Sequence, residues 1–111
     1  MDGQHDSALE RRFDQRMWRI CERAQSECGY NAARFRTMLG QHGGFETAKL
    51  LLQGRSGPQW AAGLEAMWRC RRLDLTVEAL ALEAEFESLF SHDQRLTAQK
   101  RLSQLGYEPG A

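Results

Sequence analysis

The residues of this chain best suited to recognition chemistry are arginines grouped around one short turn. Arg69, Arg71 and Arg72 lie within four residues, and Asp74 follows two positions later. Guanidinium groups bind carboxylates and phosphates through paired hydrogen bonds, so the cluster could recognise an acidic protein surface or a phosphate backbone. It could instead be structural, with Arg69 or Arg72 pairing with Asp74 or Glu78 to lock the turn. The residue types favour the structural interpretation, with the partner contact as the alternative.

No catalytic arrangement is indicated elsewhere. Ser91, His92 and Asp93 are the residue types of a hydrolase triad, but three consecutive residues cannot point toward one another as a proton relay requires. We therefore expect Ser91 to cap a helix. Four glutamates after the turn are expected to form a solvated acidic face: Glu78, Glu83, Glu85 and Glu87. The phosphate-binding loop motif is also missing, which argues against an anion site of that kind. With no catalytic arrangement indicated, we expect neither an enzyme nor a bound cofactor.

The three cysteines, Cys21, Cys28 and Cys70, have no CxxC spacing. On a helix Cys21 and Cys28 would lie about 10.5 Å apart along the axis, beyond disulfide reach. We predict that all three are reduced, small core residues. The three histidines lack ligand spacing relative to the cysteines, so no metal site is expected.

Composition and hydropathy predict a cytoplasmic domain. Proline is scarce at 2 of 111 residues, which suits helices. No stretch approaches the roughly 18 apolar residues of a membrane span. Residues 1–6 lack the positive charge and the apolar run of a signal peptide.

Helix start and stop signals divide the chain into about six helices. The first is predicted to begin at a capping box, Ser7-Ala8-Leu9-Glu10, and to stop at Gly29. One apolar stripe runs along this helix at steps of three and four residues: Leu9, Phe13, Met17, Ile20, Ala24 and Cys28.

Shorter helices are predicted in the rest of the chain. Their expected ranges are 32–42, capped by Asn31 and broken at Gly43-Gly44, then 45–52, 58–72, a helix capped by Thr76, and one capped by Ser91 that ends at Gly106. Helices this short are unstable alone and must pack on the first. The predicted fold is all-α: a compact bundle of about six helices. Residues 1–5 would be a frayed N-terminus, 6–107 a single helical domain, and 108–111 a tail.

Three tryptophans are large anchors for a small domain. Trp60 and Trp68 are eight residues apart and so share one helix face, which predicts core packing. The alternative is that at least one ring is partly exposed and serves as a binding hot spot. The predicted structural corner comprises Trp68, Asp74, Thr76 and Glu78. The candidate partner-binding residues are Trp18, Arg19, Arg23, Arg69, Arg71 and Arg72.

Charge is divided unevenly although the formal net charge is zero. Residues 1–72 hold 12 Lys or Arg against 8 Asp or Glu, and residues 73–111 hold 3 against 7. The two halves would neutralise one another if they pack side by side. If they stay apart, they would offer a basic and an acidic face to partners.

One set of residues resembles a small bacterial helical domain to which no activity is assigned. The resemblance covers about residues 30–107. It is carried by Tyr30-Asn31, Phe35, Met38-Leu39, Gly43-Gly44, Ala48, Leu51, Gly63-Leu64, Trp68, Arg72-Leu73-Asp74-Leu75-Thr76-Val77-Glu78, Leu89-Phe90, Arg101-Leu102 and Gly106-Tyr107. That domain occurs alone or at the C-terminal end of larger proteins, some of which resemble restriction or defence ATPases and nucleases. The resemblance implies an accessory module of a multi-component system and no catalytic residues.

Two functions are therefore expected from the sequence. The first is a non-enzymatic interaction module that docks onto a protein, or onto a second copy of itself, without membrane contact. The alternative is nucleic-acid binding by the basic N-terminal half. Zero net charge argues against strong nonspecific DNA binding, which would also weaken steeply with salt.

Overall fold

The apolar stripe predicted on the first helix is the centre of the fold. In the computed structural model, which describes residues 7–53 and 58–108 and only the backbone of 58–62, helix α1 spans Ser7–Cys28. Its buried side chains are Leu9, Phe13, Met17, Cys21 and Ala24. Four of the six predicted stripe positions are among them, so the helical periodicity predicted the core face correctly.

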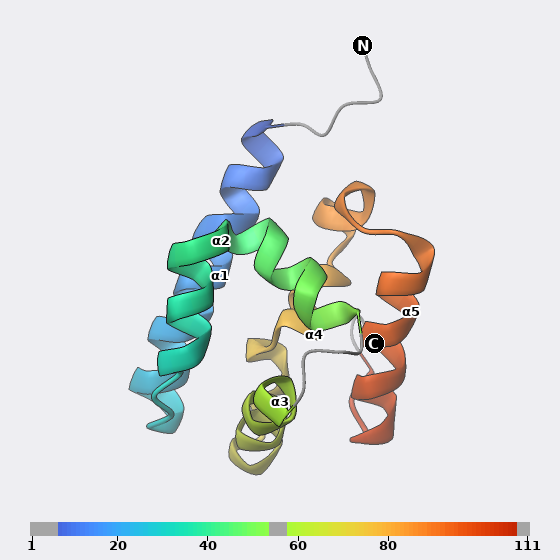
Figure 1. Ribbon diagram of the computed structural model, residues 1–111. Coiled ribbons are helices and arrows are strands. Elements are labelled where there is room, and N and C mark those ends of the chain that lie inside the picture. The colour runs from blue at the N-terminus through green and yellow to red at the C-terminus, as the bar shows by residue number, and fades with distance from the viewer. Residues whose placement is uncertain (1–6, 54–57, 109–111) are drawn as a thin grey trace.

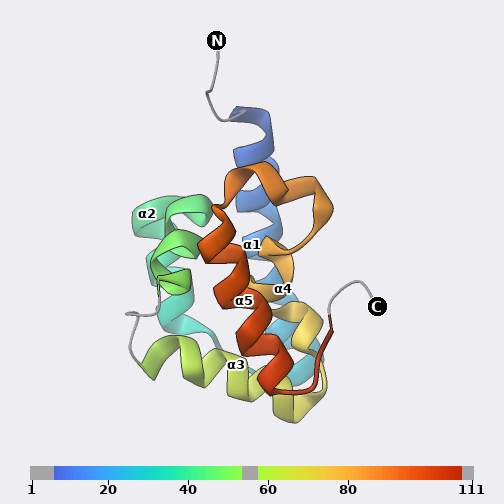
Figure 2. The same ribbon diagram turned by 90° about the vertical axis from the view of Figure 1, so that its right-hand side faces the viewer.

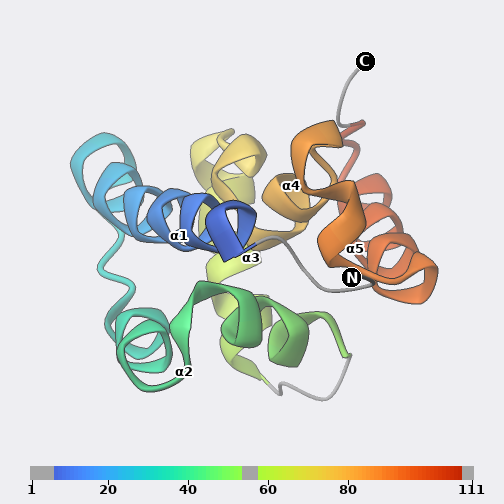
Figure 3. The ribbon, with the colours of Figure 1, turned by 90° about the horizontal axis from the view of Figure 1, so that it is seen from above.

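The described residues are all-α and contain no strand, as predicted. After α1 come α2 (Ala33–Leu52), α3 (Pro58–Cys70), η1 (Leu73–Leu75), α4 (Val77–Ala81), η2 (Ala84–Leu89) and α5 (His92–Gln104), where η denotes a 3-10 helix. Helix α1 lies between α2 on one side and the η1–α4 region on the other (Figure 3). Helix α3 lies across one end of the bundle, and α5 packs against α4 and α2 (Figures 1 and 2). None of the described helices is long and apolar enough to cross a membrane.

Helix α2 is bent where Gly43-Gly44 predicted a break. Gly43 has φ +81° and ψ 166°, a conformation favoured by glycine, and the two arms continue on either side of it. The backbone N–H of Gly44 donates to Asp14 Oδ1 of α1 at 2.7 Å. Thr47 Oγ1 then donates across the bend to the carbonyl of Met38 at 3.1 Å. Counting the two arms separately, the described chain has six α-helical segments.

Other helix boundaries divide into confirmed and wrong predictions. Thr76 and Ser91 cap α4 and α5 through their side chains, and Ser91 forms a complete capping box with Gln94. Asn31 does not cap α2: the residue in that position is Ala32, which makes no side-chain cap. The helix predicted after Thr76 is split into α4 and η2, because the backbone is extended at Glu83.

Four aromatic rings meet in the larger core cluster, two of them from the segment that follows the split between α4 and η2. The ring of Phe13 on α1 contacts Phe86 and Phe90 edge-on, with centroids 5.1 and 5.2 Å apart. Phe45 of α2 contacts Phe90 from the other side at 5.7 Å. A second cluster under α3 includes Leu64, Met67, Leu73, Leu75, Ala79 and Leu102.

We predict that Gly44→Ala destabilises the fold by about 1–3 kcal/mol. A Cβ at this position would lie 2.7 Å from Asp14 Cα, which is backbone and cannot move without separating α1 from α2. Gly40→Ala is the matched control, because its Cβ would meet nothing within 4 Å. The free energy of unfolding of that control should rise by about 0.5–1 kcal/mol, because alanine has a higher helix propensity than glycine. Urea unfolding of both variants measures the difference, and equal stability would contradict the close α1–α2 contact.

Candidate functional site

The predicted arginine turn forms a corner between α3 and α4. Thr76 Oγ1 accepts from the N–H of Ala79 at 3.1 Å and donates to the carbonyl of Leu73 at 2.6 Å. Leu73 and Leu75 are buried in η1 between these groups. The hydroxyl therefore ties the end of η1 to the start of α4, and Thr76 is the corner residue that was predicted.

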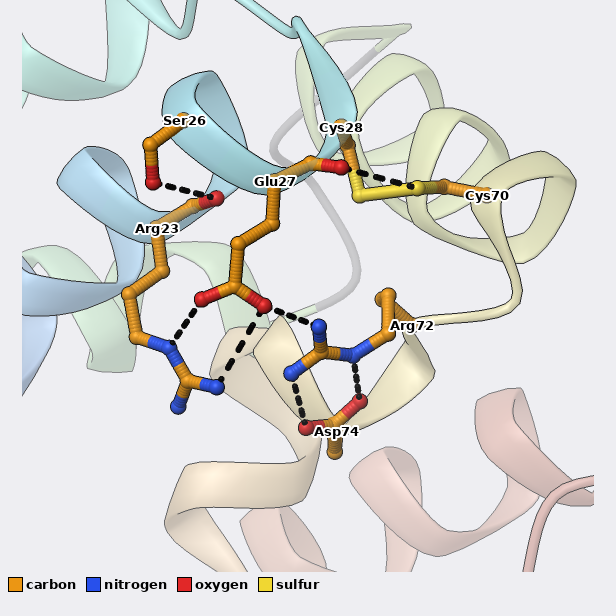
Figure 4. The surroundings of a disulfide bond; sticks show 7 residues. All are labelled: Arg23, Ser26, Glu27, Cys28, Cys70, Arg72 and Asp74. Atoms are coloured by element: carbon orange, nitrogen blue, oxygen red, sulfur yellow. Dashed lines mark hydrogen bonds and ion pairs between the residues drawn. A yellow bond between two sulfur atoms is a disulfide. The ribbon is translucent and has the colours of Figure 1, made fainter.

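Arg72 holds this corner to the end of α1 (Figure 4). Its Nε and Nη2 donate to the two carboxylate oxygens of Asp74 at 3.0 and 3.1 Å, and its Nη1 donates to Glu27. Glu27 also accepts from Arg23 Nε at 2.7 Å. Hydrogen bonds from Arg23 and Arg72 lower the pKa of Glu27, and those from Arg72 lower the pKa of Asp74. The predicted Arg72–Asp74 lock is therefore present, and it extends to α1.

A disulfide bond joins Cys28, at the end of α1, to Cys70, at the end of α3 (Figure 4). The prediction that all three cysteines are reduced is thus wrong for these two. The physical reason is tertiary, because α3 crosses the end of α1 and brings together residues 42 positions apart. Cys21 is free and buried, as predicted, and burial raises the pKa of its thiol to about 11.

Arg71 ends α3 in a backbone conformation that arginine seldom adopts. Its φ is +62°, and it is the one residue other than glycine with positive φ in the described ranges. Its N–H donates to the carbonyl of Trp68, and the next N–H, of Arg72, donates to Met67. This pair of bonds is a Schellman motif, whose left-handed position is usually glycine. Gly106 holds the equivalent position at the end of α5.

Trp68 lies on the surface beside Arg71 and lines an open hollow. Its relative exposure is 48%, so the predicted core packing is wrong, and the alternative of a partly exposed ring holds. The hollow is also lined by Arg69, Arg71, Leu73, Leu105, Gly106 and Tyr107. Trp60 lies among the residues whose side chains are outside the described part. We refer to Trp68, Arg69, Arg71 and Tyr107 below as the Trp68 surface.

The other predicted partner-binding residues do not join the Trp68 surface. Arg72 and Arg23 are engaged in the corner network. Trp18 is 37% exposed, and its helical position places it on the flank of α1 that faces α2, where Asp14 contacts Gly44. Arg19 is exposed, and its spacing from Arg16 and Arg23 places it on the flank of α1 that carries those arginines, away from Trp18. The sequence thus grouped residues that α1 presents in different directions.

The acidic segment packs against arginines of α1 and does not form a free acidic face. Arg12 pairs with Glu85 at 2.7 Å, and Arg16 pairs with Glu83 at 2.6 Å. The prediction of a solvated face is confirmed for Glu85 and Glu87, which are exposed, and wrong for Glu78, which is 4% exposed and accepts from Arg101 at 2.9 Å. Burial raises the pKa of Glu78 despite the opposing hydrogen bond from Arg101. The sequence does contain one signal that Glu78 is buried, because it is the one charged residue in the otherwise apolar segment 77–82.

A second concave region, missed by the sequence reasoning, is an apolar cavity of about 430 Å³. It lies between α1, the first arm of α2, α3 and the η1–α4 corner. Its apolar wall includes Ile20, Ala24, Phe35, Met38, Leu64 and Met67. The helical periodicity identified most of these residues as core residues, but it carries no information on the space left between them.

Comparison with known proteins adds no relative to these observations. No protein-family model, curated protein or solved structure matches the chain. The function of the chain must therefore be inferred from its own surfaces.

We predict that the disulfide makes a large contribution to stability. Closing a loop of 42 residues in the unfolded chain corresponds to about 4 kcal/mol in the chain-entropy estimate. Replacing both Cys28 and Cys70 by Ser should lower the urea midpoint, and reductant should lower it for the wild type but not for the double variant. Thiol titration of the unfolded, unreduced protein should find only Cys21. Three titratable thiols would contradict the bond.

We also predict that the corner network contributes to stability at neutral pH and is lost in acid. The pKa of Asp74 is lowered in the folded state, so its contribution is present above the unfolded value and disappears as pH falls below about 4. Since the Asp74 side chain is 46% exposed, we expect Asp74→Asn to cost only about 0.5–1 kcal/mol at pH 7.

Urea unfolding from pH 7 to pH 3 measures this contribution. The difference between wild type and Asp74→Asn should shrink in acid. Glu65→Gln, which removes an exposed pair with Arg69, is the control and should differ little from wild type at any pH. A difference for Asp74→Asn that stays constant with pH would argue against the ion pair.

Proposed function

We propose that this chain is a non-enzymatic protein-interaction module that docks through the Trp68 surface onto an acidic partner. The half-exposed ring of Trp68 beside Arg71 carries the proposal. Tryptophan, tyrosine and arginine are the residue types that dominate binding hot spots, and all three line this one hollow.

The conformation of Arg71 supports the same surface. Residues other than glycine in the left-handed region cost about 1 kcal/mol or more, and such strain gathers at functional positions. Gly106 shows that the chain uses glycine in the equivalent motif at the end of α5. The Arg71 side chain is thus held next to Trp68, and the left-handed backbone that holds it lowers the stability of the fold relative to glycine at this position. No ion pair engages it within the described part of the chain.

Charge favours an acidic protein over a nucleic acid as the partner. Arginines of α1 and the corner are largely engaged internally, as Arg12, Arg16 and Arg72 illustrate. What remains at the hollow is a small positive site with aromatic neighbours. Such a site matches a few carboxylates on a protein surface better than the long phosphate track that DNA presents.

The wider setting of the proposal comes from the resemblance of residues 30–107. It suggests an accessory subunit of a bacterial multi-component system, concerned with defence or counter-defence. Such a subunit would be expected in the cytoplasm. The Cys28–Cys70 bond argues against that location, since disulfides persist mainly in oxidising compartments.

A photo-crosslinking residue placed at position 68 tests the docking surface. It should form a covalent adduct with one protein, and the adduct should disappear in Arg71→Glu. The same residue at position 18, the other exposed tryptophan, is the control and should not form that adduct. An adduct that forms only from position 18 would move the interface to α1.

We predict that Trp68→Ala weakens binding of the purified, crosslinked partner by about 30-fold, equivalent to about 2 kcal/mol. The melting temperature should change little, because the ring is half exposed. Trp18→Ala should change affinity less than threefold. Unchanged affinity for Trp68→Ala would overturn the proposal. Binding of a DNA duplex that weakens steeply between 50 and 200 mM salt would favour the nucleic-acid alternative instead.

A further inference from the structure

The apolar cavity beside α1 is separate from the Trp68 surface and has the features of a ligand site. None of the four residues of the Trp68 surface lines it. Its volume of about 430 Å³ falls within the range of roughly 300–1,000 Å³ that is common for small-molecule pockets. Two of its wall residues, Met38 and Met67, are flexible thioethers that adapt to ligands of different shape.

Small residues create the space. Gly63 of α3 lines the cavity, and a Cβ at this position would have Tyr30 Oη as its nearest neighbour, at 3.9 Å. Ala24, Ala32 and Ala33 line it as well. An occupant that covers this apolar wall would remove it from water and so stabilise the folded chain.

The polar groups of the interior are already paired with protein atoms. Glu78 lines the cavity, but its Oε2 accepts from Arg101, which also donates to the carbonyl of Leu51 at 2.8 Å. Thr76 Oγ1 both donates and accepts within the corner. A ligand therefore finds hydrocarbon walls and a compensated ion pair there, which suits an uncharged apolar chain.

The edge of the cavity at the start of α2 is positive. Arg34, in the first turn, and Asn31, just before the helix, both line the cavity and are exposed. The helix has no side-chain cap at Ala32, so its first N–H groups are open to an external acceptor. The sequence between Cys28 and Phe45 contains Arg34 and Arg36 but no acidic residue. Helix dipole and guanidinium thus act in the same direction, toward an anion.

We propose that this cavity binds an amphiphile, with its hydrocarbon chain along the apolar wall and an anionic head group, such as a carboxylate, at Arg34. The Arg34 guanidinium and the first-turn N–H groups of α2 bind the head group. The wall formed by α1, α3 and α4 binds the chain by burial. This site is independent of the docking surface and remains if that proposal fails.

Three ligands with the same chain and different head groups test both halves of the inference. Calorimetric titration of the full chain with dodecanoate, dodecanol and dodecylamine, each below its micellar concentration, should give the tightest binding for the carboxylate and the weakest for the amine. Arg34→Gln should weaken dodecanoate about tenfold and dodecanol less than twofold. Absence of saturable binding by all three would overturn the site. Amine binding as tight as carboxylate binding would overturn the anionic head group.

A variant that fills the cavity separates binding there from binding elsewhere. Gly63→Leu extends a side chain into the space, so it should weaken dodecanoate at least 30-fold while its unfolding midpoint stays equal or rises. Gly63→Met, with a more flexible side chain, gives the same test if leucine fails to fold. Gly40→Leu, at an exposed helical glycine away from the cavity, should bind as the wild type does. Unchanged binding in a folded Gly63 variant would place the ligand outside the cavity and overturn the proposal.

Discussion

The fold depends on one helix that is covered on both flanks. Helix α1 buries Phe13 and Met17 completely, and it contacts α2 on one side and η1, α4 and η2 on the other. The two flanks are joined differently. The α2 flank allows close backbone approach at Gly44, whereas the other flank is held by arginines that reach the acidic segment. Burial of apolar side chains drives the association of the helices on both flanks, and the polar contacts differ from one flank to the other.

The charge separation along the chain is largely cancelled by the way the chain folds. Arg12 and Arg16 of α1 meet Glu85 and Glu83 of η2, so the basic and acidic halves lie against each other. Exposed pairs of this kind contribute little stability singly, but they leave few free charges on that flank. Arg11, Arg19, Arg34 and Arg71 are exposed and make no ion pair within the described residues. Of these four, Arg71 and Arg34 line a concave surface, the first beside Trp68 and the second at the cavity.

Local signals predicted most of the fold, and tertiary contacts explain what they missed. Gly29 and Gly106 end helices with positive φ, and Thr76 and Ser91 begin them, because each of these roles depends only on neighbouring residues. Arg72 pairing with Asp74 was equally local.

The Cys28–Cys70 bond and the exposure of Trp68 depend instead on where α3 crosses the bundle, which no spacing reveals. The left-handed Arg71 has no sequence signal at all, since arginine does not favour that conformation.

The buried pair of Glu78 and Arg101 limits how this sequence can diverge. Losing Arg101 removes the guanidinium that compensates the buried Glu78 carboxylate, whereas exchanging both residues for hydrocarbon of similar volume can be nearly neutral. A related sequence that has replaced Arg101 but kept Glu78 is therefore expected to fold poorly. For this reason, residues 78 and 101 are expected to change together among related sequences.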